Sequence, residues 1–300
     1  MQNRRNFIKT IIGGSALAAL PASAYTFWGR ETQKLVILHT NDTHSRIDPI
    51  PNDGSQYAGM GGVARRMTLI DKIRREHEHV LLLDSGDIFQ GTPYFNFYDG
   101  KLELQLMTRM KYDASTLGNH EFDNGIDNLS HQLQYAGFPF INTNYDVSET
   151  ALNGKLKRSH IIQKGNLRIG LIGLGINPKG LIADSNYKGM LYNAPVQTGD
   201  LEAKMLKEKE HCHLVIALSH LGLKMDAIDD LKVAAQTRHI DLIIGGHTHT
   251  FMETPEMVTN LNGNPVVIQQ AGTAGICLGR LDVVFEQGEA KTTSRIYEVK

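Results

Sequence analysis

The stretch TLGNHEFDNG, Thr116–Gly125, crowds hydrogen-bonding side chains into one short turn directly after the strand-like residues YDAS. A tight turn explains Gly118 and Asn119, but it does not require the His, Glu and Asp that follow them. Binding and catalytic residues concentrate on loops that a rigid scaffold positions. The stretch therefore indicates a functional loop at the end of a strand, with partners elsewhere in the chain.

Short runs rich in Val, Ile and Leu divide the chain and are typical of strands buried on both faces. Stretches with helical periodicity separate many of them. Strands that alternate with helices predict an α/β fold. The expected strands are 34–40, 79–87, 138–142, 167–175, 213–220 and 240–247, and the expected helices are 63–79, 125–137, 193–211 and 225–237.

The C-terminal part of the chain differs, because no helical pattern separates its apolar runs at 264–272, 277–288 and 293–300. This spacing predicts an antiparallel hairpin or meander. The chain shows no internal repeat and no low-complexity linker. We therefore expect residues 25–300 to form one domain.

The N-terminus reads as an export signal over residues 1–24. Basic residues precede an apolar run of about ten, and Ala22-Ser23-Ala24 offers an A-x-A cleavage site. Arg4-Arg5 resembles the twin-arginine signal, which exports folded proteins. The pattern predicts a periplasmic protein, and failure of cleavage would leave it tethered to the membrane.

Composition narrows the class of protein. The 300 residues carry 31 basic and 32 acidic side chains, a net charge of −1, so no basic surface argues for nucleic acid as a partner. Cys212 and Cys277 are the two cysteines, which excludes a disulfide scaffold and leaves their pairing open.

Polar side chains stand at the ends of five runs, KLVIL, VLLL, YDAS, HLVIAL and IDLII. Ligand sites in α/β sheets form beyond the carboxyl ends of the strands, so these loops should converge. Carboxylate, amide oxygen and imidazole suit divalent ions, and there are more of them than one tetrahedral zinc uses. Two ions can clamp a phosphoryl group. The candidates are Asp42, His44, Asp87, Asn119, His220, His247 and His249.

The series DTH, GD, GNHEFD, SH and GHTH resembles the motifs of the calcineurin-like metallophosphoesterases. The surrounding LHTNDTH, GGVARR, DSGDIFQGTP and TLGNHEFD are closest to the bacterial 5′-nucleotidase and UDP-sugar hydrolase branch. The resemblance spans about residues 34–290. It implies a four-layer α/β/β/α sandwich of two mixed sheets, with a dimetal site at one edge.

The resemblance also implies roles for individual residues. Asp87 would bridge two ions, which are manganese, zinc or iron, and a hydroxide between them would attack phosphorus. His120 would contact the phosphate and assist the leaving group, with Asp123 orienting its imidazole. The first ion would be held by Asp42, His44, Asp87 and His249, and the second by Asp87, Asn119, His220 and His247. In the nucleotidase branch the position of His249 is often Gln.

The substrate implied is a nucleotide, although other readings stay open. Two-domain 5′-nucleotidases stack the base on aromatic residues of a C-terminal domain. We expect only the catalytic domain here, so a separately encoded chain would supply specificity, or an open site would take a broad range of phosphodiesters. The alternatives are a thiohydrolase of sulfur oxidation and a non-catalytic metal- or nucleotide-binding module.

Other polar residues near these motifs have structural interpretations. Asp84 is expected to cap its loop, and Glu121 and His39 to be structural, buried groups. The Gly61-Gly62 pair is expected to open a helix, with Arg65 and Arg66 on its solvated face. Surface positions are expected for His160, His211 and His213, the last two flanking Cys212.

Overall fold

The computed structural model describes residues 10–11, 18–19, 32–286 and 289–300. The export signal predicted over residues 1–24, including Arg4-Arg5 and Ala22-Ser23-Ala24, therefore lies outside the described residues, apart from two dipeptides. Among the helices that the structure describes, none has the length and apolar character needed to cross a bilayer.

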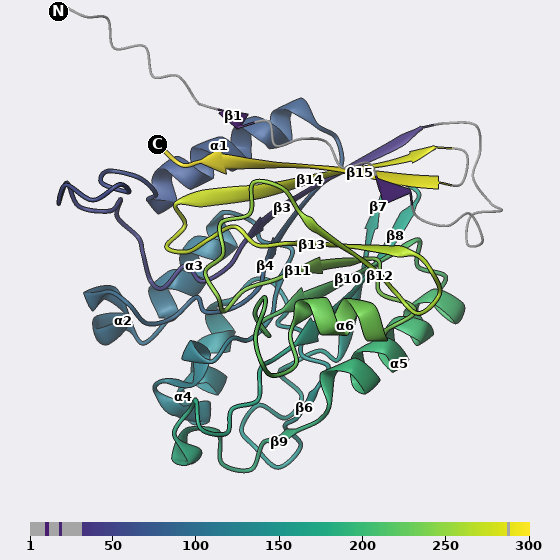
Figure 1. The fold of residues 1–300 in the computed structure, drawn as a ribbon. Helices are drawn as coiled ribbons and strands as arrows, with labels where there is room; N and C mark the ends of the chain where they lie inside the picture. Colours follow the sequence, from purple (N-terminus) through teal and green to yellow (C-terminus); the bar gives the residue numbers. More distant parts are fainter. Residues whose placement is uncertain (1–9, 12–17, 20–31, 287–288) are drawn as a thin grey trace, which may run out of the picture.

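The first sheet is mixed and seven-stranded (Figure 1). Strands β3, β4 and β5 run parallel, whereas β14 and β15 form an antiparallel hairpin that pairs with β3. Its strands, in spatial order, are β1 (Thr10–Ile11), β15 (Glu289–Glu298), β14 (Cys277–Glu286), β3 (Gln33–Thr40), β4 (Val80–Asp84) and β5 (Ala114–Ser115), with β2 (Ala18–Ala19) also paired to β15.

The second sheet is also mixed and has six strands. Strands β8, β10, β11 and β13 are parallel, and an antiparallel strand closes each edge. In spatial order they are β12 (Glu256–Thr259), β13 (Pro265–Gln269), β11 (Leu242–Ile244), β10 (Leu214–Ser219), β8 (Leu167–Leu174) and β7 (Ser159–Lys164). A small separate sheet pairs β6 (Tyr145–Asp146) with β9 (Leu191–Tyr192).

Alternation along the strands creates three apolar layers. On β3, Leu35 and Ile37 join the cluster between the two sheets, whereas Val36 and Leu38 join the cluster beneath the helices. Successive side chains of a strand point to opposite faces, so a strand covered on both faces is apolar throughout. The four-layer α/β/β/α sandwich predicted from the motifs is confirmed.

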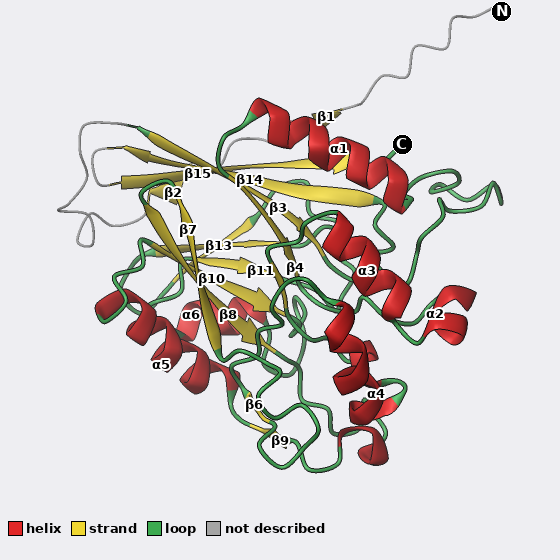
Figure 2. Cartoon of the chain, turned by 180° about the vertical axis from the view of Figure 1, so that it is seen from behind, coloured by secondary structure: helices red, strands yellow, loops and turns green. Residues whose placement is uncertain are grey.

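Helices cover the outer face of each sheet (Figure 2). Ile70 and Ile73 of α1 belong to the apolar cluster between the first sheet and its helices. Ala203 of α5 and Val233 of α6 belong to the corresponding cluster on the second sheet. The helices are α1 (Val63–Glu76), α2 (Pro93–Tyr98), α3 (Lys101–Arg109), α4 (Gly125–Gln132), α5 (Pro195–Glu208) and α6 (Asp230–Gln236), and the 3₁₀ turns are η2 (His120–Phe122), η3 (Leu133–Tyr135) and η4 (Asp184–Tyr187).

Several local expectations need correction. The run at 138–142 forms only isolated bridges, through Phe140 and Ile141. Residues 265–269 pair within the second sheet, so only the last two C-terminal runs form the predicted hairpin. Helix α6 begins five residues later than expected, because Asp229 caps it by accepting the backbone N–H of Lys232 at 2.8 Å.

The structure also differs from the sequence-based expectations in the α2–α3 region and at Arg66. No helix was expected between residues 93 and 109, where α2 and α3 lie. Arg65 is exposed as expected, but Arg66 is only 3% exposed and points into the protein, where its charge acts on the buried Asp84. A buried guanidinium beside a buried carboxylate offsets a charge that would otherwise be costly.

Candidate metal centre

Five loops at the carboxyl ends of strands bring the predicted ligand residues together. Strands β3 and β4 of the first sheet lead into the loops of Asp42 and Asp87, and β5 leads into that of Asn119. In the second sheet, β10 ends one residue before His220, and β11 ends three residues before His247. The predicted convergence of loops from both sheets is therefore observed.

One group of side chains joins the β3 loop to the β11 loop. The Nε2 atom of His249 lies 3.2 Å from the Oδ1 atom of Asp42, and 3.0 Å from the Nε2 atom of His44. Asp42 is fully buried. One ligand atom from each of the three residues lies within 4.8 Å of the others, a spacing that suits a single ion.

A second group surrounds the carboxylate of Asp87. His220 places its Nε2 atom 3.0 Å from Oδ2 of Asp87, and His247 completes this cluster. The Nδ1 atom of His247 lies 3.0 Å from the amide oxygen of Asn119. Asp87 also shares a cluster with His44, so its carboxylate lies between the two groups.

The orientation of the imidazoles fits metal binding. The Nδ1 atom of His220 lies 2.6 Å from the carbonyl oxygen of Ser85, and that of His44 lies 3.3 Å from the carbonyl oxygen of Phe89. Metal-binding histidines commonly donate one ring N–H to such an acceptor and thereby aim the other nitrogen at the ion. The Nε2 atom of His220 is buried and lies beside the carboxylate of Asp87.

The pKa values of the clustered histidines and carboxylates also fit a cation site. Burial lowers the pKa of His220, but the carboxylate of Asp87 outweighs this effect and raises the pKa to about 10. Burial raises the pKa of Asp87, but His220 holds it below its usual range. Burial lowers the pKa of His247 to about 4, so this ring is neutral and able to ligate. The buried carboxylates therefore require positive charge beside them.

The backbone at the site adopts an uncommon conformation. The φ angles are 51° at Asp42, 47° at His44, 55° at Asp87, 71° at His247 and 51° at His249. Positive φ at residues other than glycine costs about 1–3 kcal/mol and concentrates at functional sites. This strain is not visible in the sequence, and it turns the side chains toward a common centre.

Gly118 explains part of the opening motif. A Cβ atom at this position would overlap the carboxylate and the backbone nitrogen of Asp87. The turn can therefore approach the β4 loop only because the residue is glycine.

His120 opens η2 beside the same centre, and Asp123 follows that turn. The Nδ1 atom of His120 lies 2.8 Å from Oδ2 of Asp123, and its backbone N–H donates to Oδ1 of Asp87 at 2.8 Å. The hydrogen bond with Asp123 raises the pKa of His120, although burial opposes the shift. The ring centroid of His120 is 5.2 Å from that of His44, and one grouping also places His120 with His44 and Asp87.

Glu121 has the structural role that the sequence indicated. It is fully buried and accepts four backbone N–H groups. One comes from Gly118 of its own turn, and three come from residues 87–89 of the β4 loop. Glu121 therefore ties together the two loops that carry Asn119 and Asp87.

Asn41 is a further residue of the site that the sequence motifs do not single out. Its Nδ2 atom donates to Oδ2 of Asp42 at 2.6 Å and to the carbonyl oxygen of Gly272 at 2.7 Å, while its Oδ1 atom accepts the N–H of Ala271 at 2.8 Å. Asn41 thus fixes one carboxylate oxygen against the loop that follows β13. An amide directly before the motif aspartate was the available signal.

Asp84, His39 and His211 lie as expected, whereas His160 and His213 are more buried than the surface positions expected for them. Asp84 accepts the N–H of Gly86 at 2.9 Å and lies outside the metal-ligand groups, and His39 is buried with its Nε2 atom 3.3 Å from Oε1 of Gln269. His211 is exposed, and His160 and His213 are half-buried. Cys212 and Cys277 are both buried and unpaired.

Comparisons with known proteins agree with this geometry. The family description "calcineurin-like phosphoesterase" matches residues 35–251. A snake venom 5′-nucleotidase of Crotalus adamanteus is 34% identical over 289 residues, covering 90% of this chain and 47% of that protein. The trifunctional nucleotide phosphoesterase YfkN of Bacillus subtilis is 34% identical over 288 residues, covering 84% and 18%.

A solved structure is similar over the same region. It is a 5′-nucleotidase precursor of Thermus thermophilus, with a TM-score of 0.81, 33% identity, and coverage of 89% of this chain and 55% of that one. The chain thus spans about half the length of this protein and of the venom enzyme.

Proposed function

Because the chain belongs to the calcineurin-like phosphoesterase family, we propose that it hydrolyses phosphate esters of nucleotides in the manner of a 5′-nucleotidase. The observation that carries the proposal is the convergence of the candidate ligands on two clusters, which His44 and Asp87 link, with the His120–Asp123 pair beside them. The similarity to nucleotide-hydrolysing relatives supports the choice of substrate.

Calcineurin-like phosphoesterases bind a dimetal centre, and the residues here fit one. Two divalent ions, for which manganese, zinc and iron are the candidates, would neutralise phosphate charge and supply an activated water. We assign the first ion to Asp42, His44, Asp87 and His249, and the second to Asp87, Asn119, His220 and His247.

The chain's own groups would act on the phosphate and the leaving group. Asp123 favours the protonated form of His120, so the imidazolium can stabilise negative charge on the phosphate or donate a proton from Nε2 to the leaving oxygen. The amide oxygen of Asn119 lies beside His247, so the NH₂ group of Asn119 is left as a donor for a phosphate oxygen.

Export and a specificity partner complete the proposal. The basic residues, apolar run and A-x-A site over residues 1–24 support twin-arginine export to the periplasm. The relatives, about twice as long as this chain, support base recognition by a further C-terminal domain.

The test combines metal analysis with hydrolysis of 5′-AMP, UDP-glucose, a chromogenic phosphodiester and a thiosulfonate. About two ions per chain with turnover of 5′-AMP would support the proposal. Turnover of the chromogenic ester alone would separate phosphoester chemistry from nucleotide specificity and move the search to a partner chain. Thiosulfonate cleavage without phosphate release would assign a thiohydrolase, and bound ions without any turnover would refute the proposal.

A further inference from the structure

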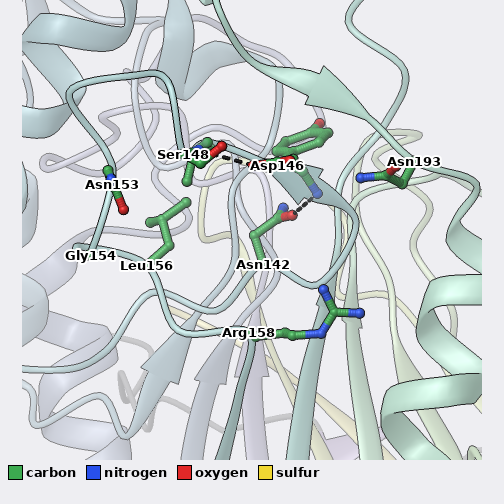
Figure 3. Close-up of a pocket in the computed structure, with 10 residues that line it drawn as sticks. Asn142, Asp146, Ser148, Asn153, Gly154, Leu156, Arg158 and Asn193 are labelled. Carbon is green, nitrogen blue, oxygen red and sulfur yellow. Dashed lines mark hydrogen bonds between the residues drawn. The ribbon is translucent and has the colours of Figure 1, made fainter.

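A second polar cavity, separate from the metal centre, lies beside the small β6–β9 sheet (Figure 3). It has a volume of about 410 Å³, enough for a small metabolite, and none of its lining residues is a candidate metal ligand. The residues that matter most are Asn142, Asp146, Arg158 and Asn193.

Asn142 offers a buried donor without a partner. The residue is 4% exposed, and its Nδ2 atom is buried and makes no hydrogen bond. Its Oδ1 atom accepts the N–H of Tyr145 at 2.8 Å, which fixes the amide, and Asn142 lines the cavity. A buried polar group without a partner costs about 1–3 kcal/mol, so a bound acceptor would relieve a real penalty.

Arg158 brings a positive charge to the same cavity. Its Nε atom donates to Glu202 at 2.7 Å, an interaction that engages one edge of the guanidinium. Within the described part of the chain, no hydrogen bond is seen for its two terminal NH₂ groups. Figure 3 shows the guanidinium turned toward Asn142, with the Asn193 side chain on the same side of the cavity.

These groups point to the chemistry of the occupant. The planar, multi-donor guanidinium and the amide N–H groups match the oxygens of a phosphate, sulfate or carboxylate. Asp146 lines the same cavity and carries a negative charge at neutral pH, because the hydrogen bond from the Ser148 N–H lowers its pKa. This carboxylate would repel a polyanion but could accept hydroxyl donors.

We propose that this cavity binds a small molecule through one oxyanion group, held by Arg158, Asn142 and Asn193. The site lies on the catalytic domain and is independent of the nucleotidase proposal. Tetrahedral and planar oxyanions share this chemistry. Sulfate serves as the tetrahedral probe and acetate as the planar one.

The test is an NMR titration of the zinc-loaded protein with each probe. The backbone amides of Tyr145 and Gly154 report on the cavity, whereas those of Gly118 and His120 report on the metal centre. We expect saturable shifts at the cavity reporters, and the stronger probe identifies the oxyanion as tetrahedral or planar.

Variants then test the named side chains. Arg158→Gln removes the charge, and Asn142→Asp replaces the Nδ2 donor with an acceptor while keeping Oδ1 for the Tyr145 N–H. Each should weaken binding at the cavity reporters about tenfold or more, because each loses a hydrogen bond to a charged group.

Arg168→Gln is the matched control. Arg168 is 40% exposed and paired with Glu210 at 3.2 Å, whereas the Arg158 side chain is 55% exposed and paired with Glu202. The control should bind as the wild type does. Unchanged affinity in Arg158→Gln, an equal loss in Arg168→Gln, or no saturable shift with either probe would overturn the proposal, whatever the outcome of the hydrolysis assays.

Discussion

Replacing Glu121 with Gln should destabilise the metal centre through the backbone rather than through a ligand. In the wild type, Oε2 accepts the N–H groups of Gly118 and Asp87 at 2.6 and 2.9 Å, and Oε1 accepts those of Ile88 and Phe89 at 2.7 and 3.2 Å. A Gln side chain keeps one oxygen and places an NH₂ group against the other two donors.

The magnitude follows from that count. Two buried N–H groups without acceptors cost about 1–3 kcal/mol each, so the free energy of unfolding should fall by about 2–6 kcal/mol. Burial raises the pKa of Glu121 to about 7, so we would measure above this value, where the side chain is a carboxylate. Because the β4 loop carries Asp87, metal content should also fall.

Urea unfolding of the chelated protein, followed by metal titration, separates the two effects. Glu103→Gln provides the control. Glu103 is 3% exposed, burial raises its pKa, and its carboxyl oxygens make no hydrogen bond of ordinary geometry. Its replacement should be neutral or stabilising. Equal stability losses in the two variants, or a Glu121→Gln protein as stable as the wild type, would refute the reasoning.

Three further results are expected. Asp87→Asn should lose both ions and phosphate release together, as metal analysis would show, and retention of two ions would contradict its bridging position. His120→Ala should keep both ions but lose about 10²–10⁴-fold in turnover, and loss of the ions would instead make His120 a ligand. Burial lowers the pKa of His39 from 6.5 to about 4. As the pH falls below 6.5, His39 therefore takes up a proton in the unfolded chain but not in the folded protein. Urea unfolding should therefore show about 2 kcal/mol less stability from this group at pH 5 than at pH 7, a loss absent in His39→Gln.

The sequence predicted the site better than it predicted the local structure around it. Polar residues after apolar runs are a strong signal, because strand ends are easily located and parallel strands share an edge. Pairing partners are harder to infer. Residues 265–269 enter the second sheet through long-range contacts, and the run at 138–142 has strand composition but little pairing. Tertiary context decides such segments.

Asn41 and Arg66 show a second limit. Both have polar side chains that are usually exposed, yet both are buried, at 2% and 3% exposure. Asn41 is satisfied by hydrogen bonds to Asp42 and to residues 271–272, which lie far from it in the sequence. Composition and periodicity carry no information on such distant partners.

The left-handed backbone at the centre links the architecture to the chemistry. The parallel β3 and β4 loops support each other, because the N–H groups of Asp42 and His44 donate to the carbonyl oxygens of Gly86 and Asp87 at 2.9 and 3.0 Å. The backbone N–H groups of Asp42 and His44 are therefore held by the neighbouring loop. The cost of this backbone conformation is therefore offset by hydrogen bonds that form on folding. An ion that binds only this folded arrangement would in turn stabilise the sandwich that maintains it.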